Sequence, residues 1–283
     1  MTRGARRALA GLALALACGP APQRSDAGAR RIVSQVVFAD EELLQLGDDV
    51  RARVVGVSSL ADDGRYSGVS ARWPDTVPRV AGVEAIVALS PDLVLTAEFT
   101  APETRAQLAD LGIATVELTG WNGFDDYRRH VTELAAAVHA EAEGRARVAA
   151  FDTRLASLRE RFAGGPSPGV VSWQEGVVAG RGTIFADELA AAGFRDLAGE
   201  QGVVGHATVA LERLLAWDPE YLVVPCERDC AETARSFAAR PGIASTAAAR
   251  AGHVVAIEAP LLFSTGAGML DVIERLGPAR GVP

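Results

Sequence analysis

Five aromatic side chains lie in loops that follow short apolar segments, where they could stack on a ligand. They are Trp73, Phe99, Trp121, Trp173 and Phe263. Aromatic rings in such loops suit a large planar or apolar ligand, because each ring buries a wide surface and stacks with a preferred geometry. For each ring the alternative is packing in the protein core, and the sequence leaves that alternative open.

Three further loop residues could add polar contacts to the same ligand. Tyr66 lies in a glycine-flanked loop and His206 precedes a predicted helix. A tyrosine oxygen or a histidine nitrogen can coordinate ferric or haem iron. Arg181 stands between two glycines and could pair with a carboxylate of the ligand. The alternative for all three is a solvated side chain on an exposed loop.

The composition argues against most enzyme classes. The chain contains no lysine, so all 28 basic residues are arginine, which excludes a P-loop lysine and a Schiff-base lysine. Residues 56–60 lack the second glycine of a nucleophile elbow. Residues 180–185 lack the last glycine of a dinucleotide fingerprint. We therefore expect no catalytic residues, and a hydrolase is the least favoured function.

The four histidines do not suggest a site for bare zinc or manganese. His130 and His139 are nine residues apart on a predicted helix, which at about 100° per residue places them on opposite faces. His253 begins a predicted strand. Such sites need about three histidines and carboxylates that converge. We expect no metal site and no intrinsic cofactor.

Two cysteines, Cys226 and Cys230, are four residues apart near the end of a predicted strand. An oxidising compartment favours a disulfide between them. The alternative is a metal clip, which would need two more soft ligands close by.

The N-terminus predicts export. Residues 1–17 combine a basic start with an apolar run that is shorter than the about 20 residues of a membrane span, as in a signal peptide. The run ends before Cys18 in a sequence that resembles a bacterial lipobox, so we expect Cys18 to carry a lipid anchor and residues 18–30 to form a tether. The alternative is an ordinary signal peptide cut after Ala17. The expected location is extracytoplasmic, with the membrane contacted through the anchor only.

The net charge excludes a general nucleic-acid binder. It is −8 for the whole chain, and loss of the three arginines of residues 1–17 brings it to −11. An acidic protein without a basic patch binds nucleic acid poorly.

Short apolar segments alternate with helical patterns along the chain. We predict strands at 32–38, 54–57, 93–95, 114–118, 170–173, 221–224 and 254–257, and helices at 41–46, 102–111 and 184–192. Alternation of this kind predicts parallel sheets covered on both faces. In the middle, apolar residues recur at helical spacing from Val148 to Phe162. One helix from Glu141 to Phe162 would be about 33 Å long.

An internal repeat relates the two halves of the chain. Residues 84–95 align with residues 212–223 at a constant offset of 128, and Gly112-Ile113 recurs as Gly242-Ile243. Both copies predict a short helix, a turn with proline and an acidic residue, and a buried strand. We therefore predict an α/β protein of two Rossmann-like lobes joined by a single long backbone helix. The lobes span 31–140 and 165–283, and the helix spans 141–163.

These segments together resemble the helical-backbone, or class III, periplasmic binding proteins of ABC importers. The similar stretches are 31–34, 54–59, 84–94, 182–193 and 212–223. That family serves importers of vitamin B12, ferric siderophores, haem and some bare metals. The resemblance implies a monomer with a ligand in the cleft between two lobes, and a backbone helix that restricts closure of the lobes.

The resemblance also implies the partners. In the family, one surface glutamate on each lobe docks on arginines of the inner-membrane permease, and the matching positions here are Glu84 and Glu212. The alternative is that each is an acid favoured by a helix N-terminus. Cobalamin-binding relatives carry aromatics where this chain has Leu60, Ala97 and His206. The expected ligand is therefore a small-molecule iron chelate, siderophore or haem, with cobalamin as the alternative. A purely structural lipoprotein would need no converging aromatics.

Overall fold

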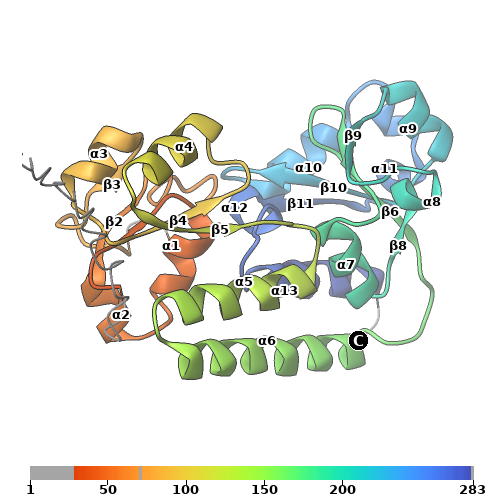
Figure 1. The fold of residues 1–283 in the computed structure, drawn as a ribbon. Coiled ribbons are helices and arrows are strands. Elements are labelled where there is room, and N and C mark those ends of the chain that lie inside the picture. The colour runs from red at the N-terminus through yellow and green to blue at the C-terminus, as the bar shows by residue number, and fades with distance from the viewer. Residues whose placement is uncertain (1–28, 70–71, 282–283) are drawn as a thin grey trace, which may run out of the picture.

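The computed structural model describes residues 29–69 and 72–281. Two α/β lobes stand side by side above one long helix (Figure 1). This arrangement confirms the predicted fold class. Within the described residues no helix is both long enough and apolar enough to cross a membrane.

The N-terminal lobe is built on one parallel sheet of five strands in the order β3-β2-β1-β4-β5. Its strands carry buried valine, leucine and isoleucine, as expected for a sheet covered on both faces. The elements are β1 (Ile32–Ser34), α1 (Val37–Leu43), α2 (Asp48–Arg53), β2 (Val54–Ser58), β3 (Arg79–Val80), α3 (Val83–Ala88), β4 (Leu93–Ala97), α4 (Pro102–Asp110), β5 (Ala114–Leu118) and α5 (Phe124–Ala137).

The C-terminal lobe has a parallel sheet in the order β11-β10-β6-β8 and a separate antiparallel pair, β7 and β9. Its elements are β6 (Gly169–Ser172), β7 (Val177–Ala179), α7 (Ile184–Ala191), β8 (Arg195–Asp196), α8 (Leu197–Glu200), β9 (His206–Thr208), α9 (Leu211–Trp217), β10 (Tyr221–Cys226), α10 (Cys230–Ala238), η1 (Ile243–Ser245), α11 (Ala247–Ala251), β11 (Val254–Glu258), α12 (Ala259–Leu262), α13 (Met269–Leu276) and η2 (Gly277–Arg280). A disulfide joins Cys226 to Cys230 between β10 and α10.

The long helix is α6 (Glu141–Arg161), and it runs beneath both lobes (Figure 1). The predicted apolar stripe is its buried face, which includes Phe151, Leu155 and Leu158. Gly144 allows α5 and α6 to approach closely, because a methyl group there would lie 2.4 Å from the Cβ atom of Ala135. The sequence shows no turn signal between these two helices, yet α5 ends at Ala137.

The internal repeat corresponds to equivalent structure in both lobes. The first copy forms α3 and β4, and the second forms α9 and β10. In each copy the helix is followed by a residue with positive φ, Ser90 at 47° and Asp218 at 44°, and these two positions are equivalent in the repeat. Both turns lead directly into a buried central strand.

Two local predictions need correction. The apolar run 32–38 is not one strand, because β1 ends at Ser34 and α1 begins at Val37 instead of residue 41. The Ser34 hydroxyl accepts a hydrogen bond from the Val36 N–H, which turns the chain, and the apolar side chains continue onto the buried face of α1. His139 also does not share a helix with His130, because it lies past the end of α5 with φ at 54°.

Candidate functional site

A cleft between the lobes consists of three adjoining cavities of about 290, 360 and 210 Å³. Phe263, just after α12, lines all three. Trp173 lines the first two, and Tyr66 lines the second and third. We call these three cavities together the interlobe cleft, and the first of them the apolar pocket.

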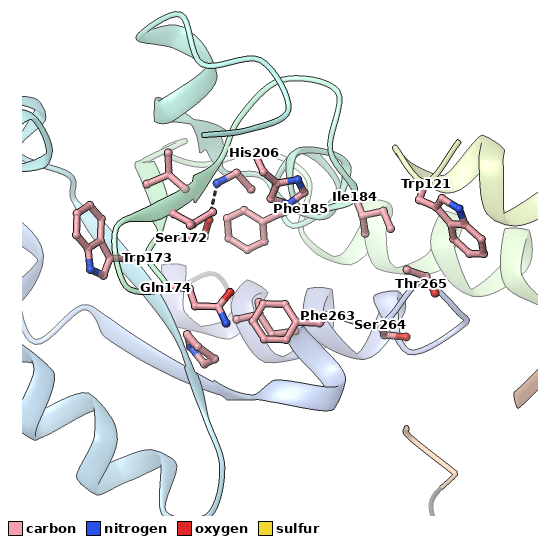
Figure 2. Close-up of a pocket in the computed structure, with 15 residues that line it drawn as sticks. Trp121, Ser172, Trp173, Gln174, Ile184, Phe185, His206, Phe263, Ser264 and Thr265 are labelled. Atoms are coloured by element: carbon pink, nitrogen blue, oxygen red, sulfur yellow. Dashed lines mark hydrogen bonds between the residues drawn. The ribbon is translucent and has the colours of Figure 1, made fainter. Parts of the chain in front are cut away.

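The apolar pocket is enclosed by residues of both lobes (Figure 2). Most come from the C-terminal lobe, and Trp121 faces them from the N-terminal lobe. The lining residues are Trp121, Ser172, Trp173, Gln174, Val177, Val178, Ala179, Ile184, Phe185, His206, Pro225, Leu262, Phe263, Ser264 and Thr265. Apart from His206 they carry no titratable side chain, so the pocket suits an apolar or aromatic surface.

The start of α7 delivers two of these side chains, Ile184 and Phe185. Thr183 is the N-cap, and its buried hydroxyl accepts a hydrogen bond from the Ala186 N–H at 3.2 Å. A second contact joins the strands β6 and β7, because the Ser172 hydroxyl accepts from the Ala179 N–H at 3.0 Å (Figure 2). Both contacts fix the backbone from which the pocket side chains project.

Trp121 is held by other aromatic rings of its own lobe. Its ring centroid lies 5.5 Å from that of Phe38, 5.6 Å from that of Phe99 and 4.1 Å from that of His130. His130 is buried, and its Nε2 contacts the Thr119 carbonyl oxygen at 2.9 Å. Burial lowers the pKa of His130, so the ring is neutral at pH 7. Phe99 remains 67% exposed and offers a free face to a ligand.

Charged groups gather beside the apolar pocket in the second cavity. Arg65 and Arg240 line it together with Tyr66, Glu175 and Glu227. The Arg65 guanidinium lies 5.5 Å from the centroid of the Tyr66 ring, and Arg65 also pairs with Asp63 at 2.7 Å. A ligand with an apolar body and anionic groups would therefore meet aromatic rings in one cavity and arginines in the next.

Six of the eight ligand residues predicted from the sequence line the interlobe cleft. They are Tyr66, Phe99, Trp121, Trp173, His206 and Phe263. The other two lie elsewhere and correct the prediction. Trp73 is 3% exposed in the N-terminal core, and its indole N–H donates to the Asp40 carbonyl oxygen at 3.1 Å. Arg181 packs toward α8, where its Cγ atom would meet a methyl group at Gly199 at 2.6 Å.

The sequence reasoning missed several pocket residues. Phe185, Ile184 and Gln174 line the pocket but were not predicted. The N-cap residue Thr183 could have indicated Ile184 and Phe185. A helix that follows a strand begins at the carboxyl edge of the sheet, which is the edge where the cleft loops lie. Leu60 lines the third cavity, whereas Ala97 is fully buried and reaches none of the three.

A hydrogen bond joins the two lobes next to the apolar pocket. The N-cap of α5 is Gly123, which has no side chain, and Asp187 of α7 takes over its role by accepting from the Phe124 N–H at 3.0 Å. A methyl group at Gly123 would lie 2.3 Å from the Asp187 Oδ2 atom, so the close approach requires glycine.

Replacing Asp187 by alanine is expected to lower the free energy of unfolding by about 1 kcal/mol, the usual value of a helix cap. Asp187→Asn keeps an acceptor and should lose less. Urea unfolding followed by circular dichroism measures both. Asp125→Ala is the matched control, because Asp125 lies in the first turn of the same helix and its side chain is fully exposed. Equal losses for Asp187→Ala and Asp125→Ala would show that Asp187 is no cap.

Two similar parallel α/β lobes with a shared cleft define a ligand-binding protein of the two-lobed class. A family model described as periplasmic binding protein matches residues 51–261, which is most of the chain. The protein therefore belongs to the periplasmic binding protein family, whose members are substrate-binding proteins of transport systems.

Individual relatives carry different ligands. A cobalamin-binding protein of Halobacterium salinarum is 26% identical over 273 residues, which cover 90% of this chain and 70% of the relative. The periplasmic heme-binding protein RhuT of Roseiflexus sp. RS-1 is 25% identical with a TM-score of 0.74, covering 89% of this chain and all of that one. A periplasmic heme-binding protein of Pseudomonas aeruginosa is 25% identical with a TM-score of 0.73, covering 89% of this chain and 92% of that one.

Proposed function

We propose that this protein captures an iron chelate, a siderophore or haem, in the interlobe cleft and delivers it to an inner-membrane ABC permease. One observation carries the proposal: exposed aromatic side chains from both lobes line one mostly apolar cleft, with Tyr66 and two arginines beside it. A planar chelate with anionic groups has the complementary chemistry. The heme-binding names of two relatives agree with this choice.

Roles within the cleft follow from its chemistry. Phe99, Trp121, Trp173 and Phe263 would stack on the ligand, while Tyr66 or His206 would contact the metal or a polar group of the chelate. Arg65 and Arg240 would pair with its carboxylates.

Cobalamin is the second candidate, because a relative that covers most of this chain is named a cobalamin-binding protein. Three positions argue against cobalamin, because the family resemblance leads us to expect an aromatic carbocycle at each of them in a cobalamin-binding protein. Here Leu60 and His206 line the cleft at two of these positions, and the third, Ala97, is buried.

The proposal includes the anchor and the lobe boundaries. Residues 1–17 would be a signal peptide, Cys18 the lipid attachment site and 18–30 a tether; all but the end of the tether lie outside the described residues. The lobes would span 31–140 and 165–283, with 141–163 between them. The protein would act as a monomer, with Glu84 and Glu212 docking on the permease.

A thermal-shift screen of the full-length protein tests the ligand. The probes are haemin, ferric hydroxamate and catecholate siderophores, cyanocobalamin, and zinc and manganese salts. A ligand at 100 times its Kd stabilises the folded state by about 2.7 kcal/mol, which corresponds to a rise of about 5 °C in Tm. We expect that rise, with quenching of tryptophan fluorescence, for one iron chelate. A response to cyanocobalamin alone would select the second candidate. A response to bare metal alone, or to no probe, would contradict the proposal.

A further inference from the structure

Three consecutive acids on α1 lie beneath the cleft, and each has a different partner. Asp40 is fully buried and accepts hydrogen bonds from the backbone N–H and the hydroxyl of Ser58. Glu42 is also buried and pairs with Arg147 of α6 at 3.0 Å. These two side chains fix α1 to β2 and to the backbone helix. Glu41, between them, makes its hydrogen bond to a different segment.

Glu41 instead lies between two segments that carry ligand residues. Its Oε1 atom accepts from the Gly68 N–H at 2.8 Å, and Gly68 belongs to residues 61–69, which we call the Tyr66 loop. Its Oε2 atom faces Gly266 of the other lobe, where a methyl group would lie 2.9 Å away. Gly266 ends residues 263–266, which we call the Phe263 segment. Glu41 also lines the third cavity of the cleft.

We propose that Glu41 is a positioning residue for ligand capture, whose carboxylate holds the Tyr66 loop on α1 next to the Phe263 segment. This inference rests on the proposed function, because it assumes that Tyr66 and Phe263 contact the ligand. Tyr66 is 48% exposed, and the Arg65 guanidinium of the same loop lies 5.5 Å from its ring centroid. The Tyr66 and Ser67 N–H groups brace the loop internally by donating to the Asp63 carbonyl at 2.9 Å, and the Gly68 bond attaches this braced loop to Glu41 of α1.

Protonation should modulate this contact. Burial raises the pKa of Glu41 to about 7; the neighbouring carboxylates Glu42 and Asp40 also raise it, and the bond from Gly68 lowers it. Glu41 and Glu42 also line a further cavity, and the other charged residues around that cavity are Arg72, Arg147, Arg154 and Asp271. A carboxylate accepts a hydrogen bond about twice as strongly as a neutral group. The hold on the Tyr66 loop should therefore weaken as the pH falls below about 7.

The direction of this effect separates positioning from overall stability. A carboxyl whose pKa is raised on folding stabilises the fold most at low pH, and its contribution is lost as the pH rises from about 4.5 to about 7. The contact of the Tyr66 loop has the opposite dependence, because the charged form makes the stronger bond. A purely structural Glu41 would show only the first dependence.

Glu41→Gln tests the proposal, because glutamine keeps the shape and mimics the neutral acid at every pH. Two readouts are used on the full chain: the hydrogen-exchange protection factor of the Gly68 amide without ligand, and the rate of haemin dissociation. In the wild type we expect protection to be about fivefold lower, and dissociation about fivefold faster, at pH 6 than at pH 8. Glu41→Gln should behave at pH 8 as the wild type does at pH 6.

Glu220→Gln is the matched control. Glu220 also accepts a backbone N–H, from Gly169 at 2.7 Å, but does not line the interlobe cleft. It should keep the wild-type pH profile in both readouts. An unchanged profile in Glu41→Gln would overturn the inference. If haemin does not bind, the haem form of the proposed function fails, while Gly68 protection in the ligand-free protein still decides whether Glu41 holds the loop.

Discussion

Reversing the charge of both Glu84 and Glu212, to arginine, is expected to abolish ligand uptake and leave ligand affinity unchanged. Both side chains are exposed in the first turn of their helices, α3 and α9. These helices lie on the outer parts of the two lobes, on the side of the molecule opposite α6 (Figure 1). In the double variant, the arginines of the permease that pair with Glu84 and Glu212 would face arginines instead. Like charges in contact cost several kcal/mol, so uptake should fall more than about 100-fold.

The measurement compares haemin-dependent iron uptake by cells that rely on this protein with haemin affinity of the purified variant. Glu143→Arg with Glu160→Arg is the matched control, because both acids are exposed on α6, on the opposite side. Those reversals should leave uptake intact. If the double reversal at Glu84 and Glu212 lowers haemin affinity, or leaves uptake unaffected, the docking assignment is wrong.

Replacing Arg147 by methionine is expected to destabilise the fold by about 3–5 kcal/mol. Arg147 of α6 makes two parallel bonds to Glu42 of α1, at 3.1 Å and 3.0 Å. Glu42 is 2% exposed at its side chain, so losing the arginine leaves a buried carboxylate without a counter-charge. Removing one member of a buried pair costs far more than removing both. Glu42→Leu with Arg147→Met should therefore recover most of the loss.

The same pair predicts a pH dependence. Burial raises the pKa of Glu42, and Arg147 opposes that rise. Without Arg147 the pKa should rise further, and a carboxyl with a raised pKa in the folded state loses its contribution as the pH increases above its unfolded value. Arg147→Met should thus be less destabilising at pH 5 than at pH 8. Urea unfolding at both pH values measures this difference.

Arg154→Ala provides the control on the same helix. Arg154 pairs with Asp271 and Glu274 of α13, but all three side chains are between 39% and 47% exposed. Exposed ion pairs contribute about 0–1 kcal/mol, so this variant should lose little at either pH. A loss as large as that of Arg147→Met would mean that burial does not explain the difference.

The sequence by itself determined the architecture. The repeat of residues 84–95 at 212–223 predicted two similar lobes, and helical spacing from Val148 to Phe162 predicted the helix between them. These signals survive because hydrophobic periodicity reflects which face of a helix or strand is buried, and that pattern is local. The equivalent positive-φ residues Ser90 and Asp218 show how closely the two copies share a backbone.

The limits of the prediction appear where local patterns compete. The run 32–38 looked like one strand because residues of a buried strand and of a buried helical face are equally apolar. The end of α5 carries no glycine or proline, and the two helices separate at residues 138–140, where His139 has φ at 54°.

Only the tertiary structure decided which side chains form the candidate site. Trp73 and Trp121 both lie in loops after strands, yet Trp73 packs in the core and donates to the Asp40 carbonyl, while Trp121 lines the apolar pocket. Phe185 is buried with the core residues, and its ring also lines that pocket. Which face of a loop meets the other lobe depends on contacts between residues far apart in the chain, such as Asp187 with Phe124 and Glu41 beside Gly266. Composition and periodicity carry no record of those contacts, because they describe only neighbours along the chain.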